Sequence, residues 1–180
     1  MTKWIVLLRG VNVGGHHIVP MKKLRELLEK AGFSDVLTYI QSGNCVFRSD
    51  LPDRDRVGEI VAGAIEGEFG FRPSAFVLTA DDLEAAIAAN PFPPDAGKAV
   101  HFLFLNGRPA KADLDGLRRV ARASEDFAMT ERVLYLHTPE GYGTSIMAQK
   151  LGQFIKADMT GRNLNSVLKI AEMARLLPGA

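Results

Sequence analysis

Cysteine and long apolar runs are both scarce in this sequence, and each absence excludes a class of protein. Cys45 is the single cysteine among 180 residues, which excludes an internal disulfide and a cysteine-based zinc cluster. The N-terminal apolar run, Trp4 to Leu8, is interrupted by Arg9 and is too short for a signal-peptide core or a transmembrane helix. We therefore predict a cytoplasmic protein that does not enter a membrane.

The sequence also lacks an excess of either charge. Its 22 Lys and Arg residues nearly balance 21 Asp and Glu residues, for a net charge of +1, so a wholly basic nucleic-acid-binding protein is not expected. The charges are unevenly distributed, with +3 over residues 1–50, −5 over 51–100, +1 over 101–150 and +2 over 151–180. The two basic chain ends either form a local patch or are ordinary solvated faces.

Apolar periodicity in the first half of the chain predicts a βαββαβ order, which is that of the ferredoxin-like fold. The strand at residues 4–8 does not alternate, so we expect both of its faces to be covered. Capping and turn residues place the other boundaries. The predicted elements are this strand, a helix from Pro20 to a stop at Gly32, strands Val36–Ile40 and Cys45–Arg48 around QSGN, a helix capped by Asp53, and strand Ser74–Leu78.

The second half repeats this order loosely, without a sequence repeat. The predicted elements are a short helix over 81–89, strand Ala99–Leu105, helix Leu114–Ala123, strands Phe127–Thr130 and Val133–His137, a helix capped by Thr144 or Ser145 that runs through Ile155, and a final helix over 163–177. We therefore predict the α+β class, with two ferredoxin-like (βαββαβ-type) subdomains packed together, the second ending in an extra C-terminal helix instead of a last strand. The predicted divisions are a subdomain at 1–80, a helix and stiff proline-rich linker at 81–98, and the second subdomain at 99–180.

Two polar loops are predicted to lie side by side. The string RGVNVGG (Arg9 to Gly15) follows the first strand, and QSGN follows the second. The first two strands of a βαββαβ unit are parallel, so their ends lie at one edge of the sheet, next to the start of the helix that begins near Pro20. The free N–H groups and positive dipole end of that helix favour an anion.

This edge is our leading candidate for a ligand site. Arg9 and Lys22 would supply charge, four polar side chains would orient the ligand, two glycines would offer backbone N–H groups, and two residues of the second subdomain would close the site. The candidate ligand-binding residues are Arg9, Asn12, Gly14, Gly15, Lys22, Gln41, Ser42, Asn44, Arg162 and Asn163. RGVNVGG matches neither of two nucleotide-binding patterns, G-x-G-x-x-G and G-x-x-x-x-G-K-[ST]. The alternative is that its glycines only permit a tight turn, that Asn12 caps loop backbone groups, and that Arg162 bonds carbonyls of the neighbouring subdomain.

Other candidate features favour structural roles. PEGYGTS (Pro139 to Ser145) precedes a helix in a phosphate-friendly order, but Thr144 or Ser145 already serves as its N-cap. Cys45 is predicted to be a small core residue, and His101, within an apolar strand, a satisfied core or edge group. No catalytic residue, metal site or cofactor is predicted, and whether the protein is an enzyme stays open. The central strands lack the aromatic pattern of RNA-binding sheets.

Several strings together resemble the bacterial family called domain of unknown function 1697. They are LLRGVNVGG, IVPMKKLRELLEKAGFSDVLTYIQSGNCVF, NPF and TGRNLNSVLKIAEM, and the resemblance extends over nearly the whole chain. The chain departs from the family pattern at His16 and His17, where a basic or polar residue and a proline are common, and at Leu164, where an aromatic residue is common. The resemblance implies a two-part α+β fold with ferredoxin-like elements and no established activity.

The leading functional hypothesis is binding of a small anionic ligand, such as a phosphorylated metabolite or nucleotide, at the edge formed by RGVNVGG and QSGN. A nucleic-acid binder that contacts phosphates through both basic chain ends is a less favoured alternative. A protein-interaction module is the third, and an exposed apolar patch would favour it over the first. The sequence leaves the oligomeric state open.

Overall fold

The computed structural model describes residues 1–179, which divide into two compact units. Unit 1 combines Met1–Ala85 with the segment that starts at Lys169, and unit 2 comprises Ala86–Leu168. The sequence placed all of residues 99–180 in the second subdomain. The structure instead returns the final segment to unit 1.

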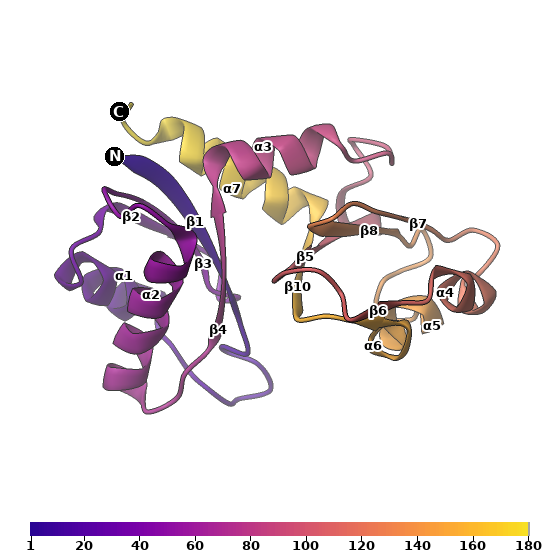
Figure 1. Cartoon of the computed structure of the whole chain (residues 1–180), viewed down its shortest axis with the longest axis horizontal. Coiled ribbons are helices and arrows are strands. Elements are labelled where there is room, and N and C mark those ends of the chain that lie inside the picture. The colour runs from indigo at the N-terminus through magenta and orange to yellow at the C-terminus, as the bar shows by residue number, and fades with distance from the viewer. Residues whose placement is uncertain (180) are drawn as a thin grey trace. The chain divides into compact units, whose positions relative to one another are not determined.

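Unit 1 contains a four-stranded antiparallel sheet with the order β2-β3-β1-β4. Its elements are β1 (Thr2–Arg9), α1 (Met21–Lys30), β2 (Ser34–Tyr39), β3 (Asn44–Ser49), α2 (Arg54–Phe69) and β4 (Ser74–Thr79), followed by α3 (Ala80–Ala88), which runs into unit 2. The βαββαβ order predicted from the sequence is confirmed. Figure 1 shows α1 and α2 on one side of this sheet.

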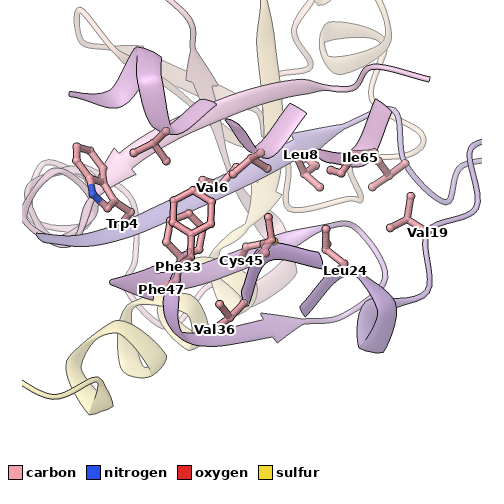
Figure 2. Close-up of a cluster of buried hydrophobic side chains, with 14 residues drawn as sticks. Trp4, Val6, Leu8, Val19, Leu24, Phe33, Val36, Cys45, Phe47 and Ile65 are labelled. Atoms are coloured by element: carbon pink, nitrogen blue, oxygen red, sulfur yellow. The ribbon is translucent and has the colours of Figure 1, made fainter. Parts of the chain in front are cut away.

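The core of unit 1 explains the unbroken apolar run of β1. Trp4 to Leu8 are all buried, as predicted. Alternate residues of this run, together with Cys45 and Phe47 of β3, pack against the apolar faces of α1 and α2; Figure 2 shows these strand side chains gathered with Leu24 and Ile65 of the helices. The predicted cap of α2 is also present, because Asp53 Oδ1 accepts a hydrogen bond from Arg56 N at 2.7 Å.

Specific polar contacts hold the final segment to unit 1. Arg175, near the end of α7 (Leu164–Leu176), donates two hydrogen bonds to the Glu84 carboxylate of α3, at 2.7 and 2.9 Å. Lys3 Nζ in β1 donates to the Leu177 carbonyl at 2.8 Å. These contacts join residues that are far apart in the sequence. The apolar periodicity of the sequence reports on local structure and therefore does not predict them.

Unit 2 contains a second four-stranded antiparallel sheet, with the order β10-β5-β8-β7, and a two-stranded ribbon of β6 and β9. Its elements before α7 are the 3₁₀ helix η1 (Gly97–Ala99), β5 (Val100–Leu105), β6 (Lys111–Ala112), α4 (Leu114–Val120), β7 (Asp126–Met129), β8 (Val133–His137), α5 (Ile146–Gln149), α6 (Leu151–Phe154), β9 (Ile155–Lys156) and β10 (Met159–Asn163). The α+β class and the C-terminal helix are confirmed.

One detail of unit 2 corrects the prediction. We expected the final helix to replace a last strand, whereas β10 pairs with β5 and the helix follows it. The strand is short and its sequence, MTGRN, lacks the alternation that marks strands. Gly161 fits here because a Cβ at this position would lie 2.9 Å from Leu103 Cδ1 on the neighbouring strand. Packing against β5, rather than local propensity, makes this segment a strand.

The helix predicted through Ile155 is also divided. Ser145 caps its first part, α5, by accepting a hydrogen bond from Ala148 N at 3.1 Å, but a second short helix, α6, begins after Lys150. In residues 1–179 no helix has the length and apolar character needed to cross a bilayer.

Candidate functional site

The loops after β1 and β2 meet, as their topology predicted. Because β1 and β2 are each antiparallel to β3, they run parallel to one another and end at the same edge. Leu8 N donates to the Gly43 carbonyl at 2.9 Å, and Asn12 Nδ2 donates to the Gln41 carbonyl at 2.8 Å. We call residues 9–19 and 40–44 together the loop pair.

The Asn12 side chain is the centre of the loop pair. Its Oδ1 accepts a hydrogen bond from Val19 N at 2.8 Å, and its Nδ2 donates to Val19 O at 3.0 Å as well as to Gln41 O. Both amide hydrogens therefore bond backbone carbonyls. Asn12 also has a positive φ of 52°, which asparagine tolerates better than most residues. This geometry gives Asn12 a structural role, the alternative to the predicted ligand contact.

The two glycines of RGVNVGG form the tip of a small hairpin. His16 N donates to Val13 O at 3.0 Å, and Asn12 N donates to His17 O at 3.0 Å. Between them, Gly14 and Gly15 have φ values of 58° and 77°. Positive φ at both central residues is the signature of a type I′ hairpin turn, for which glycine is favoured. The turn alone thus accounts for these glycines.

The second loop is closed by a buried amide. Asn44 is fully buried and donates through Nδ2 to Tyr39 O at 2.9 Å and to Ser42 Oγ at 3.0 Å. Ser42 is half-buried, and Gln41 is exposed. Asn44 and Ser42 therefore shape the turn, whereas the Gln41 side chain faces solvent.

The start of α1 has an unfavourable electrostatic arrangement. Pro20 is the N-cap and makes no side-chain capping bond, and the first turn contains no acidic residue. Lys22 and Lys23 occupy that turn, where the positive end of the helix dipole repels cations. Lys23 pairs with Glu68 at 3.1 Å, while the exposed Lys22 has no ion pair within residues 1–179. This helix start favours an anion.

Arg162 and Asn163 belong to unit 2 and have structural roles there. Arg162 is 7% exposed and donates to Thr160 Oγ1 at 2.9 Å and to Gly161 O at 2.8 Å. Asn163 Oδ1 accepts a hydrogen bond from Ser166 N at 2.9 Å and so caps α7. Thr160 lies within β10.

The sequence predicts structural roles for Cys45 and His101. Cys45 is buried in the core, as predicted. His101 stacks on Tyr142 with ring centroids 3.9 Å apart, and burial lowers its pKa to about 4. Its Nδ1 has no hydrogen-bond partner in the described part of the chain, so the predicted satisfied histidine is wrong at this atom. Residues 1–179 contain no cluster of three metal-ligating side chains.

A separate pocket of about 300 Å³ lies elsewhere in unit 1. Its lining residues are Met1, Ala31, Gly32, Phe33, Ser49, Asp50, Leu51 and Ile60. None of them belongs to the loop pair.

The prediction did not include three exposed apolar residues of the loop pair. Val13, Ile18 and Ile40 are 65%, 56% and 48% exposed. The signal available in the sequence was an aliphatic residue beside glycine, histidine or glutamine in each loop, outside any apolar stripe. We call these three residues the apolar rim.

Comparison with known proteins places the chain in a family. The family model for DUF1697, described as a protein of unknown function, matches residues 1–135. The chain belongs to the DUF1697 family. Its structure is similar to that of the conserved bacterial protein SP0830 from Streptococcus pneumoniae, with a TM-score of 0.73 and 25% identity over 96% of this chain and 98% of that one. No match is found among curated proteins.

Proposed function

We propose that this DUF1697 protein binds a small anionic, phosphate-bearing ligand at the loop pair. The observation that carries the proposal is the first turn of α1, which holds two lysines, no acidic residue and no side-chain cap. A cation in the first turn of a helix typically costs about 0.3–1 kcal/mol. A bound anion would reverse this cost and accept hydrogen bonds from the open N–H groups of the turn.

The residues of the loop pair and of the start of α1 divide into two groups in this proposal. Arg9 and Lys22 supply charge, and the exposed Gln41 side chain supplies a polar contact. Asn12 and Asn44 hold the two loops in place through their backbone bonds. The glycine tip at Gly14 and Gly15 shapes the hairpin beside the ligand.

The test compares two lysines at opposite ends of the same helix. Lys22→Ala removes a first-turn cation, whereas Lys30→Ala removes one from the last turn, and both side chains are exposed. Inorganic phosphate, sugar phosphates and nucleotides are titrated by calorimetry at low salt. We expect Lys22→Ala to weaken binding at least fivefold without lowering the thermal midpoint, and Lys30→Ala to leave affinity unchanged. Binding of none of these anions to the wild-type protein would contradict the proposal.

A polypeptide partner is the second candidate, and the apolar rim is the observation that favours it. An exposed apolar patch marks interaction surfaces in general. In that case Val13→Thr would weaken partner capture without changing the response to any small anion. A nucleic-acid partner has no comparable support, and it predicts affinity that falls steeply with salt. Cytoplasmic location stays a prediction.

A further inference from the structure

We propose that the pocket of about 300 Å³ in unit 1 binds a small organic cation, a primary amine with an apolar aryl or alkyl body. The lining comes from the end of α1, the end of β3, α2 and the N-terminus, so the pocket lies within one unit. It shares no residue with the loop pair, and the inference is therefore independent of the function proposed above. The cavity, its apolar wall and the hydrogen-bond acceptors beside it carry the inference.

The apolar wall of the pocket is continuous with the core of unit 1. Phe33 is 4% exposed and is a member of the core cluster, and the half-buried Leu51 and Ile60 pack against that cluster. The volume is at the lower end of the range of about 300–1,000 Å³ that is typical of small-molecule sites. An apolar group that displaces water from such a wall gains free energy. The pocket therefore suits a small ligand with an apolar body.

The end of α1 provides hydrogen-bond acceptors beside this wall. Phe33 N donates to Leu28 O at 3.2 Å, and Gly32 N donates to Glu29 O at 3.0 Å, with Gly32 at a φ of +96°. This is the Schellman arrangement, which closes the last turn of a helix. The carbonyls of Ala31 and Gly32, which both line the pocket, accept no hydrogen bond within residues 1–179. The end of a helix is also the negative end of its dipole, which favours a cation.

Asp50 adds a carboxylate to these acceptors. Its side chain is 75% exposed, and its Oδ1 lies 3.3 Å from the N-terminal ammonium group of Met1, which also lines the pocket. This contact shows that an ammonium group is accommodated beside the Asp50 carboxylate. No other residue forms an ion pair with Asp50 in the described part of the chain. A ligand with an ammonium group can donate to the carboxylate and to the free carbonyls of α1.

The same features disfavour other classes of ligand. An anion would be repelled by the Asp50 carboxylate and by the negative end of α1. A neutral apolar molecule would contact the wall but leave the acceptors without a donor. A small ion such as methylammonium would pair with Asp50 but leave the apolar wall in water. An amine with an apolar body satisfies both parts of the lining.

The experiment uses the single tryptophan as its readout. Phe33 packs on Phe47 with ring centroids 4.2 Å apart, and Phe47 is the cross-strand partner of Trp4 (Figure 2). Trp4 fluorescence should therefore change when the pocket is filled, and calorimetry gives the affinity. The probes are phenethylamine, methylammonium, which has the charge alone, and 3-phenylpropionate, which has a similar body and the opposite charge. We expect phenethylamine to bind about tenfold more tightly than either of the others, a difference of about 1.4 kcal/mol.

Two matched pairs of variants locate the binding. Asp50→Asn should weaken phenethylamine binding about three- to fivefold, as for the loss of a well-formed exposed ion pair. Asp95→Asn, at an exposed aspartate of unit 2 that has no ion pair within residues 1–179, should not change it. Ala31→Leu narrows the pocket at an exposed position after α1 and should weaken binding without lowering the thermal midpoint, whereas Ala89→Leu, at an exposed position after α3, should not affect binding.

Three outcomes would overturn the inference. The first is the absence of phenethylamine binding at millimolar concentrations. The second is equal affinity for phenethylamine and 3-phenylpropionate, which would show that the charge does not select the ligand. The third is binding that neither Asp50→Asn nor Ala31→Leu weakens, which would place the amine outside this pocket. None of these outcomes affects phosphate binding at the loop pair, which Lys22→Ala tests separately.

Discussion

Replacement of Asn12 by alanine tests whether the loop pair is held by one side chain. The substitution removes two donors and one acceptor, so that the N–H and C=O groups of the fully buried Val19 lose their partner. A buried polar group left unpaired costs about 1–3 kcal/mol, which loop relaxation and entering water reduce. Alanine at positive φ adds about 1 kcal/mol. We expect the free energy of unfolding to fall by about 3 kcal/mol, and the thermal midpoint by roughly 6–12 °C.

Trp4 makes this prediction measurable in unit 1 alone. It is the only tryptophan of the chain and lies buried in β1. Urea unfolding followed by its fluorescence therefore reports on the unit that contains Asn12, and a midpoint that moves without a change of slope gives the loss of stability. Asn12→Gly retains the left-handed conformation but removes the bonds, so it separates the two contributions. Asn106→Ala, at an exposed asparagine of unit 2, is the matched control and should change stability by less than about 0.5 kcal/mol.

A structural role for the Asn12 side chain is refuted if Asn12→Ala and Asn12→Gly both leave the free energy of unfolding within about 1 kcal/mol of the wild-type value. If such stable variants also lose anion binding, Asn12 contacts the ligand directly, and the glycine hairpin must be held by its backbone bonds alone. If stability falls as expected, the loss of binding in these variants says nothing about ligand contact, so Lys22→Ala remains the informative substitution for the site.

Three further predictions concern single positions. Gly43→Ala should lower the free energy of unfolding in urea by about 2–4 kcal/mol, because the φ of Gly43 is +79° and an added Cβ would lie 2.8 Å from Val11 Cγ2 and 2.9 Å from Leu8 Cβ. A change below about 0.5 kcal/mol would refute this packing. Gly14→Asn should leave the circular dichroism spectrum and the thermal midpoint nearly unchanged, because Asn-Gly suits a type I′ turn and no atom lies within 4 Å of the added Cβ. Loss of the folded spectrum would contradict the assignment of this turn. The pKa of His101 is lowered to about 4, so as pH falls from 6.5 towards 4 the unfolded state binds the proton first and stability falls. His101→Phe should remove about 2 kcal/mol of this loss of stability at low pH, a figure reduced for the partial exposure of the ring. The same pH dependence of urea unfolding in the wild-type protein and in His101→Phe would contradict the prediction.

Sequence patterns predicted the parts of the fold in which a local run of residues is compatible with a single structural role. The unbroken apolar run of β1 required burial on both faces, and Asp53 before an amphipathic stripe required a cap, and both are found. β10 could not be predicted in this way. Its residues have weak strand propensity, and its pairing depends on contact with β5, which lies more than fifty residues earlier in the chain. The final segment likewise contacts unit 1 through residues far apart in the sequence, as in the ion pair of Arg175 with Glu84.

The candidate site shows the same division between position and role. Parallel β1 and β2 imply that their loops meet, and this follows from the predicted order of the elements alone. The roles of the loop residues could not, because an asparagine has the same sequence signature whether its amide bonds a ligand or a carbonyl. Asn12 and Asn44 bond the backbone, and in the proposed function the exposed side chains of Lys22 and Gln41 contact the ligand instead. The bonds of Asn12 and Asn44 therefore change the proposed site: these amides hold the loops in place, and the first turn of α1, with two lysines and no acidic residue, is the part that attracts an anion.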